Sequence, residues 1–448
     1  MKTSARFSTS PIIRIHIALA VFAMTLCAVQ ADEFFIHDGD RVVFLGDSIT
    51  EQRLYTSYIE AYALSRHPSW KLVFRNAGWG GDTSWLRQRS HTNEAQLFAA
   101  DDATLLAMVK KAVDSGLSRD VLPLKPTIVT VDFGMNDHEY QAFRPDILRA
   151  YISSQTEIAR VFAANGIRAV FLTPQPIEDK RPDPDQDARN ISLKAFSEAL
   201  GSMAAREKAS FVDQFEPYMQ AMLRSHDSTI GGGNAVHPGP PGHTIMAWAI
   251  LKSLGATPNV SSVSIGRRPL RVETSAACRV DKLTEDGDAV SFDRLDDALP
   301  MPIDPKADSA LAIAPIISDL DVYDLRIAGL PKGGYTISID GEVAATVSAD
   351  DLAQGWNLAN SGGPITKQSR DLLAMVVRKN DLYFNRWRSV QLFSAPDWVA
   401  KGSDLEARRT AELTRLDREI DGLEAKIEAL RKPRLRHFLI APAPKDAE

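Results

Sequence analysis

Cysteine is nearly absent from this sequence of 448 residues, which contains only Cys27 and Cys278. Cys27 lies in an N-terminal segment that we expect to be removed, so Cys278 would be the only cysteine of the mature chain. An intramolecular disulfide is then excluded, and stability must come from packed cores.

Metal-binding patterns are also missing. The nine histidines are scattered along the chain, and neither a CxxC pair nor an HExxH motif occurs. These spacings are typical of zinc sites. The sequence therefore predicts no metal site and no cofactor.

An excess of positive charge is missing too, because 52 Lys and Arg residues stand against 58 Asp and Glu residues. Loss of residues 1–31 would remove Lys2, Arg6 and Arg14 but no acid, which leaves 49 basic against 58 acidic residues and a net charge of −9. A chain this acidic does not attract nucleic acid or an anionic membrane by charge. We expect no nucleic-acid partner.

A long apolar run occurs at the N-terminus, where "IHIALAVFAMTLCAV" follows the basic residues and precedes small residues near Ala31. This order is typical of a cleavable signal peptide, residues 1–31, and predicts a secreted or periplasmic protein. The run is shorter than the roughly 20 residues of a spanning helix, so we expect no stable membrane span after cleavage. An uncleaved anchor is the alternative.

Between residues 40 and 255, short β-branched apolar runs alternate with amphipathic stretches. This alternation predicts an α/β fold with a parallel sheet covered on both faces. Ligands of such sheets bind beyond the carboxyl ends of the strands. The strands are expected at residues 41–46, 71–76, 127–133, 168–173 and 210–213, and helices at residues 50–65, 146–164, 190–206 and 241–254.

Four polar segments carry candidate site residues. "GDSIT" follows the first strand with Ser48, "NAGWGGDTS" the second with Gly81, and "GMND" the third with Asn136, while "GGGNAVHPGPPGH" holds His237 between turns. Each alone has an ordinary explanation, such as a helix cap or a tight turn. Their occurrence in this order indicates one site at the sheet edge.

These segments resemble the four sequence blocks of the SGNH hydrolases, also called the GDSL esterase and lipase family, over roughly residues 38–256. The resemblance implies a flavodoxin-like three-layer sandwich with a parallel sheet, in a domain that we place at residues 32–258. It also implies hydrolysis of a carboxylic ester through an acyl-serine intermediate.

Ester hydrolysis needs residues of these types. A serine hydroxyl is a weak nucleophile, so Ser48 requires a general base, for which His237 is the candidate. The backbone amides of Ser48 and Gly81 and the side-chain amide of Asn136 would form the oxyanion hole. His243 is expected to begin the following helix rather than to take part in catalysis.

Asn234 departs from the family pattern, which usually has Asp three residues before the histidine. Its amide oxygen can accept a hydrogen bond from the imidazole but carries no charge. The site is then slow, compensated or not catalytic. Compensation would come from Asp227 as an alternative acid, from Asp213, or from a backbone carbonyl that orients a Ser–His dyad.

The sequence beyond residue 258 changes character. Alternating apolar and polar residues with Gly and Pro turns predict a small β-rich accessory domain at residues 259–355, an antiparallel sandwich with a hairpin turning at Asp340 and Gly341. A helical segment should follow at residues 356–400. Trp356 and Trp387 are expected to pack in a core or an interface, with stacking on a sugar as the alternative.

Residues 401–448 predict an amphipathic helix and a tail. The helix has apolar residues at heptad spacing from Leu413 to Leu430. Because the repeat lasts only about three heptads, we expect it to dock on the chain's own domains, and a homodimer through residues 405–430 is the alternative. The tail after Arg436 is expected to be loosely ordered.

The sequence therefore predicts a secreted or periplasmic serine esterase of a small-molecule or polysaccharide ester, most naturally a carbohydrate O-acetylesterase. A lipase or phospholipase is one alternative. Such an enzyme would have an exposed apolar rim around Ser48, and the polar loop at residues 174–190 argues against that. The other alternative is an SGNH-fold binding protein whose catalysis is weakened by Asn234.

Overall fold

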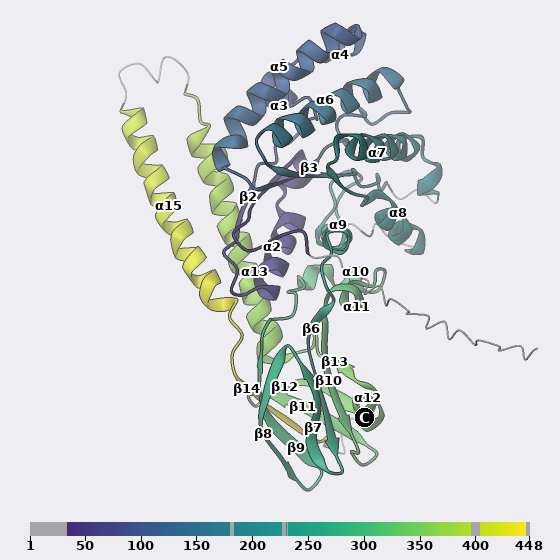
Figure 1. The fold of residues 1–448 in the computed structure, drawn as a ribbon, viewed down its shortest axis with the longest axis vertical. Helices are drawn as coiled ribbons and strands as arrows, with labels where there is room; N and C mark the ends of the chain where they lie inside the picture. Colours follow the sequence, from purple (N-terminus) through teal and green to yellow (C-terminus); the bar gives the residue numbers. More distant parts are fainter. Residues whose placement is uncertain (1–33, 180–182, 226–229, 231, 396–403, 445–448) are drawn as a thin grey trace, which may run out of the picture. The chain divides into compact units, whose positions relative to one another are not determined.

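The computed structural model describes residues 34–179, 183–225, 230, 232–395 and 404–444 (Figure 1). The predicted signal peptide at residues 1–31 and the alternative acid Asp227 lie outside the described residues. None of the helices in the described ranges is both long and apolar enough to cross a bilayer.

A five-stranded parallel sheet lies at the centre of the first half of the described chain. Its strand order is β2-β1-β3-β4-β5, which is the flavodoxin-like order with a switch point between β1 and β3. All five strands lie where the sequence predicts them. They are β1 (Arg41–Gly46), β2 (Val73–Asn76), β3 (Ile128–Asp132), β4 (Arg168–Leu172) and β5 (Ser210–Val212).

Helices cover both faces of this sheet and bury two separate cores. Successive side chains of a strand point to opposite faces of the sheet. In β1, Val42 and Phe44 therefore belong to one core, and Val43 and Leu45 belong to the other. The predicted three-layer α/β fold is confirmed. One core is covered by α2 (Leu54–Arg66), α8 (Phe215–Arg224) and α9 (Pro240–Ser253), and the other mainly by α5 (Asp102–Asp120), α6 (Pro145–Ala164) and α7 (Ala188–Glu207).

Of these helices, α5 and α8 are not among the sequence predictions. Several short elements complete the domain. They are α1 (Ser48–Glu51), α3 (Arg87–Ser90), α4 (Glu94–Ala99), η1 (Leu122–Leu124) and η2 (Pro184–Gln186).

Two further sheets share one core and form the β-rich region. Their orders are β13-β10-β6-β7 and β12-β11-β14-β9-β8. The bounds are β6 (Asn259–Arg267), β7 (Leu270–Ala276), β8 (Cys278–Asp286), β9 (Ala289–Asp296), β10 (Val322–Ala328), β11 (Gly334–Ile339), β12 (Glu342–Ser348), β13 (Trp356–Asn357) and β14 (Arg436–Pro442).

The expectation of a purely antiparallel sandwich is wrong for one strand pair, because β6 and β10 run parallel. Parallel neighbours need a crossover connection, and here it contains η3 (Pro305–Ala307), α10 (Asp308–Leu311) and α11 (Ile316–Leu320). The predicted hairpin is confirmed: β11 and β12 pair antiparallel, and Asp340 and Gly341 have φ angles of 51° and 85°, as a type I′ turn requires.

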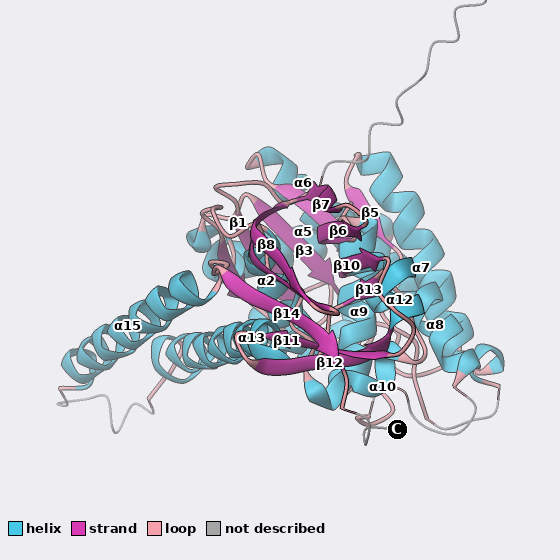
Figure 2. Cartoon of the chain, turned by 90° about the horizontal axis from the view of Figure 1, so that it is seen from below, coloured by secondary structure: helices cyan, strands magenta, loops and turns pink. Residues whose placement is uncertain are grey.

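Two long helices follow the β-rich region. They are preceded by the short α12 (Ala349–Gln354) and comprise α13 (Gly363–Phe384), continued by the π-helical η4 (Asn385–Gln391), and α15 (Leu405–Leu430). The two lie side by side (Figures 1 and 2). The apolar stripe of α15 is buried at Leu416, Ile420, Leu423 and Ile427, so the predicted docking onto the chain itself is confirmed.

The tail corrects another expectation. Residues Arg436–Pro442 are not loosely ordered but form β14, which lies between β11 and β9 and pairs antiparallel with both. Phe438 and Ile440 are fully buried in the shared core. Their alternation with exposed His437 and Leu439 is the period-2 pattern of a half-buried strand.

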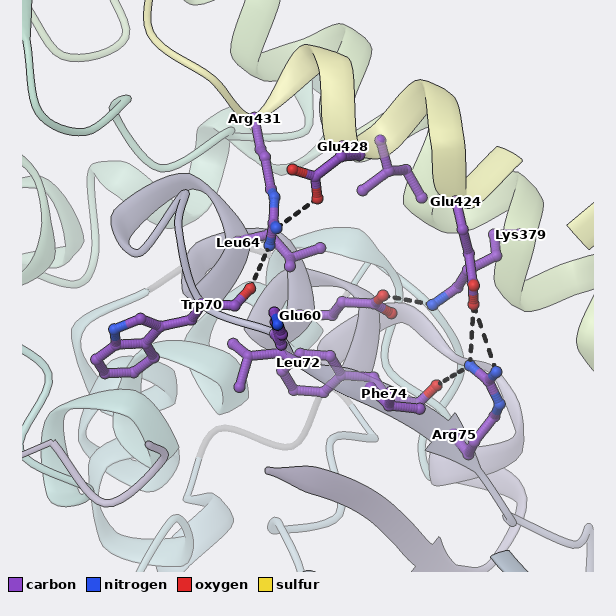
Figure 3. Close-up of a pocket in the computed structure, with 13 residues that line it drawn as sticks. Glu60, Leu64, Trp70, Leu72, Phe74, Arg75, Lys379, Glu424, Glu428 and Arg431 are labelled. Atoms are coloured by element: carbon purple, nitrogen blue, oxygen red, sulfur yellow. Dashed lines mark hydrogen bonds and ion pairs between the residues drawn. The ribbon is translucent and has the colours of Figure 1, made fainter. Parts of the chain in front are cut away.

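The helical segment is anchored to the α/β domain by polar contacts as well as by packing. Lys379 of α13 forms a buried ion pair with Glu60 of α2, and Asn380 Nδ2 donates to Ser57 Oγ over 3.0 Å. A cavity of about 240 Å³ lies between these elements, β2 and α15 (Figure 3). Charged groups that line it, such as Arg75 and Glu424, pair with one another.

Candidate active site

Ser48 lies at the first position of α1, directly beyond the carboxyl end of β1. The helix is capped by Asp47, whose side chain accepts from Ile49 N over 2.9 Å, so Ser48 is not needed as the cap. The turn is tight, because a Cβ on Gly46 would lie 2.2 Å from Thr50 Oγ1 and 2.7 Å from Asp132 O. Only glycine fits there, and the half-buried Ser48 hydroxyl is left available.

His237 reaches this hydroxyl from the loop before α9. Its Nε2 lies 2.8 Å from Ser48 Oγ, and its Nδ1 lies 3.3 Å from Oδ1 of Asn234. That oxygen also accepts from the backbone N–H groups of Val236 and His237 over 3.0 and 2.9 Å. Because only the oxygen of the amide can accept, these two donors fix its orientation, and Nδ1 of His237 then carries the proton.

Burial lowers the pKa of His237 below its ordinary value. No charge opposes this shift from Asn234, since an amide is neutral. The imidazole is therefore neutral near pH 7, with Nε2 free to accept a proton from Ser48.

The segment with Gly81 packs against α1. A Cβ on Gly78 would lie 2.3 Å from Glu51 N, and one on Gly80 would lie 2.5 Å from Glu51 Oε2 and 4.0 Å from Ser48 Cβ. Gly81 has a φ of +74°. The glycines thus allow a close approach of backbone to Ser48 that side chains would prevent.

Asn136 is tied to the same segment. Its Nδ2 donates to Asp82 O over 2.9 Å, and its Oδ1 accepts from Tyr140 Oη over 2.5 Å. The next residue, Asp137, accepts from the N–H groups of Ser84 and Gly134 over 2.9 and 3.0 Å. Burial raises the pKa of Asp137 to about 6.

His243 lies within the first turns of α9, as expected, and is fully buried. Its Nδ1 accepts from Tyr55 N over 3.4 Å, and its Nε2 lies 3.1 Å from Gln52 Oε1. Burial lowers the pKa of His243 to about 3, so it stays neutral. Gln52 Nε2 in turn donates to Pro238 O over 3.4 Å, which supports the residue after His237.

Within the described residues, neither of the two alternative acids, Asp213 and Asp227, is shown in contact with His237. Asp213 accepts from Thr173 Oγ1 over 3.3 Å and from Glu216 N over 3.2 Å, contacts that place it at the start of α8. Asp227 lies outside the described residues. The structure therefore brings together Ser48, His237 and Asn234 through direct contacts.

The charged loop at residues 174–190 contacts the histidine loop. Glu178 N donates to Ala235 O over 2.8 Å, and Gln175 Nε2 donates to Val236 O over 3.2 Å. These two hydrogen bonds support the backbone of the loop that carries His237. Within the described ranges, no group of three or more His, Cys, Asp and Glu side chains is placed to hold a metal ion.

Two neighbours of the site are not among the sequence predictions. Tyr140 follows Asn136 by four residues, a spacing that offers a weak signal. Arg388, from η4, lies over the ring of Trp79 at 3.7 Å from its centroid, with Nη2 at 3.8 Å from Glu51 Oε1. The contact between Arg388 and Trp79 could not be predicted from sequence spacing, because the two residues lie far apart in the chain.

The predicted tryptophans pack inside the protein. Trp387 is buried and meets Trp79 edge to face at 5.9 Å between centroids. Trp356 is half-buried against the core of the β-rich region. Packing in a core or an interface, the favoured expectation, describes both residues.

This α/β fold, with a serine after the first strand and a histidine within hydrogen-bond reach, is that of an SGNH hydrolase. Residues 44–245 match the model of the GDSL-like lipase/acylhydrolase family, so this part of the chain is a domain of that family of ester hydrolases. The assignment made from the four sequence segments is confirmed.

Solved structures share the fold. BT4096, described as a gut microbial diltiazem-metabolizing enzyme, is 24% identical, with a TM-score of 0.74 over 91% of this chain and 98% of that one. Its likeness extends over the α/β domain and the C-terminal sheets and helices together.

Two shorter proteins match with lower scores. Axe2, an acetylxylan esterase from Geobacillus stearothermophilus, is 21% identical, with a TM-score of 0.39 over 49% of this chain and 96% of that one. LAE5, an alpha/beta hydrolase from the metagenome of Lake Arreo, is 20% identical, with a TM-score of 0.39 over 50% of this chain and 98% of that one. No curated protein matches significantly by sequence.

Proposed function

We propose that the protein is a serine esterase that hydrolyses short-chain carboxylic esters through an acyl-serine intermediate. The observation that carries this proposal is the 2.8 Å separation of His237 Nε2 and Ser48 Oγ in a family of ester hydrolases. His237 takes the proton of Ser48 as its oxygen attacks the ester carbonyl carbon, and returns the proton to the leaving alcohol. A water molecule, activated by His237 in the same way, then hydrolyses the acyl-serine.

The negative charge on the tetrahedral intermediate needs fixed donors. The backbone N–H groups of Ser48 and Gly81 and the Nδ2 of Asn136 are the proposed oxyanion hole. Each such donor contributes about 2.7–4 kcal/mol in other hydrolases. Two contacts support this role: Gly80 packs close to Ser48 at α1, and Asn136 is hydrogen-bonded to Asp82, the residue after Gly81.

An O-acetyl group on a carbohydrate is the substrate class that we favour. A lipase would present large exposed apolar side chains around Ser48. Among the described residues of the four site segments and the turns that follow them, the exposed large hydrophobic side chains are two aromatics, Tyr140 and Phe143. Export to the periplasm or the medium, suggested by the apolar run near the N-terminus, would bring the enzyme to such substrates.

A binding protein with weakened catalysis is the second candidate, and Asn234 is the observation that favours it. In a serine triad, replacing Asp by Asn lowers kcat by about 10⁴. The intact contact of His237 with Ser48 favours the enzyme, since a protein that only binds has no need of it.

Hydrolysis of p-nitrophenyl acetate and p-nitrophenyl decanoate, together with labelling by a fluorophosphonate, tests the proposal. Wild type should hydrolyse the acetate faster and take the label, and Ser48→Ala should do neither. Ser318→Ala, which changes a serine of α11, is the matched control and should behave as wild type. Acetate release from acetylated xylan then tests the carbohydrate substrate.

Two outcomes would contradict the proposal. A wild type that neither turns over an ester nor takes the label is not a serine esterase, and the binding protein is then favoured. Faster hydrolysis of the decanoate than of the acetate would instead indicate a lipase.

A further inference from the structure

Tyr140 contacts the amide that is proposed to complete the oxyanion hole. Its hydroxyl donates to Asn136 Oδ1 over 2.5 Å, while Asn136 Nδ2 donates to Asp82 O over 2.9 Å. A backbone carbonyl can only accept, so Asp82 determines which end of the amide is the nitrogen. The end that meets Tyr140 is therefore the oxygen, and the tyrosine is the donor.

The hydrogen bonds of the Asn136 amide leave one of its N–H groups without a partner among the contacts described. Nδ2 carries two N–H groups, and the bond to Asp82 occupies one of them. In the proposed oxyanion hole, the other N–H would serve the oxyanion of the intermediate. A hydrogen bond accepted at Oδ1 draws electrons from the amide nitrogen and makes its remaining N–H a stronger donor, as in other hydrogen-bonded chains.

The backbone around Tyr140 is strained in a way that produces this contact. Glu139 and Tyr140 have φ angles of 53° and 56°, the left-handed region that costs a non-glycine residue about 1–3 kcal/mol. The turn is held by the carboxylate of Glu139, which accepts from Gln141 Nε2 over 2.7 Å and from Arg144 Nη1 over 3.3 Å. Two successive left-handed residues fold Tyr140 back onto Asn136.

We propose that Tyr140 is a positioning residue of the oxyanion hole, whose hydroxyl orients and polarises the amide of Asn136. This inference rests on the proposed serine esterase function and deepens it. Tyr140 touches Asn136 and not the reacting atoms, so its effect on the reaction passes through the amide.

The hydroxyl is suited to this task because it stays protonated. Burial, and after it the charge of Asp47, raise the pKa of Tyr140 to about 12. Part of the ring faces solvent, with 42% of the residue exposed, and its edge contact with His138 places the ring centroids 5.4 Å apart. Phenylalanine can keep these ring contacts while losing only the hydroxyl.

Tyr140→Phe is therefore the informative variant. With p-nitrophenyl acetate, kcat should fall roughly five- to tenfold, the effect of one neutral hydrogen bond, while KM and the melting temperature stay as in wild type. The rate of fluorophosphonate labelling should fall in parallel, because phosphonylation of Ser48 uses the same donors. Tyr335→Phe, which removes a hydroxyl that donates to Pro331 O in the β-rich region, is the control and should leave kcat unchanged.

A double-mutant cycle with Asn136→Ala distinguishes this role from general damage to the site. If Tyr140 acts through Asn136, adding Tyr140→Phe to Asn136→Ala should not lower the labelling rate further. An active wild type whose kcat is unaffected by Tyr140→Phe, or equal losses in both backgrounds, would overturn this inference and leave the esterase proposal intact. A wild type without turnover or labelling would overturn both.

Discussion

Nδ1 of His237 lies 3.3 Å from Oδ1 of Asn234, an oxygen that two backbone N–H groups hold in place. Asn234 occupies the position that usually holds the acid of the triad. It contacts the imidazole as the acid would, but it carries no charge. The amide can select the imidazole tautomer with the proton on Nδ1. It cannot stabilise the imidazolium that would form if His237 takes the proton of Ser48, as we propose.

Asn234→Asp should therefore increase catalysis. The new carboxylate would keep the acceptor for Val236 and His237 and add a charge next to the imidazole, so kcat should rise by at least about tenfold. It should also change the pH profile. His237 works as a base when neutral, and burial lowers its pKa in wild type, so the acid limb of kcat/KM should lie below pH 6.5, the ordinary value. The carboxylate favours the imidazolium and should move this limb to higher pH.

The pH dependence of kcat/KM for p-nitrophenyl acetate measures both effects in one series. Asp213→Asn is the control, because Asp213 accepts hydrogen bonds from Thr173 Oγ1 and Glu216 N and none from His237, and it should leave the limb where it is. If Asn234→Asp brings neither a gain nor a shift, the orienting group lies elsewhere. A loss of activity in Asp227→Ala would then identify it.

Buried carboxyl groups beneath the site make stability depend on pH. Asp132, the last residue of β3, is fully buried, and burial raises its pKa from 3.8 to about 7 although Gln214 donates to it. The folded protein thus holds this proton more tightly than the unfolded chain. The corresponding stability is present below about pH 4 and is lost as the pH rises through about 7.

Asp132 should therefore lower the melting temperature at pH 8 relative to that at pH 5, while buried His243, whose pKa is lowered to about 3, acts in the opposite direction. Asp132→Asn is neutral at both pH values, so it should shift the difference between the two melting temperatures by at least about 2 °C in favour of pH 8. Asp281→Asn, at an exposed position of β8, should keep the wild-type difference. Thermal unfolding followed by circular dichroism is sufficient, and a difference unchanged by Asp132→Asn would show that this carboxyl does not cause it.

The strands and the candidate site could be predicted from sequence because the information is local. Each strand of the parallel sheet is a short β-branched run, and Ser48 and Asn136 follow their strands within four residues. The topology of parallel sheets then brings those strand ends to one edge. The helices α5 and α8 are not predicted; α5 contains Gly116 and α8 contains Pro217, residues that weaken a helical pattern in sequence.

Contacts made over long sequence separations could not be predicted in this way. β14 alternates buried and exposed residues over its middle, a pattern that favours a strand. Its partners β9 and β11, however, precede it by about a hundred residues or more. The parallel pairing of β6 and β10 likewise depends on the crossover between them. The pairing of short β-strands depends on how their side chains pack in the core, so the sequence of one strand does not identify its partner.

Arg388 provides the sharpest case, because η4 brings it to the ring of Trp79, two residues before Gly81. Its guanidinium also lies 3.8 Å from Glu51, the residue against which Gly80 packs. Arg388 thus joins the C-terminal helical segment to both sides of the proposed oxyanion hole. A cation over a tryptophan face contributes about 0.5–2 kcal/mol, enough to restrict a glycine-rich loop.

Arg388→Gln should therefore lower kcat several-fold, because the Gly81 N–H loses its fixed position, and Arg388→Lys should restore part of the loss by returning the charge. Arg386→Gln is a matched control in the same π-helical turn, since Arg386 pairs with Asp417 of α15 and not with Trp79. It should reduce the melting temperature without reducing kcat. Steady-state kinetics and thermal unfolding of the three variants check this expectation. Equal losses of kcat in Arg386→Gln and Arg388→Gln would mean that the helical segment acts only through its stability, and that the stack on Trp79 has no separate effect on the site.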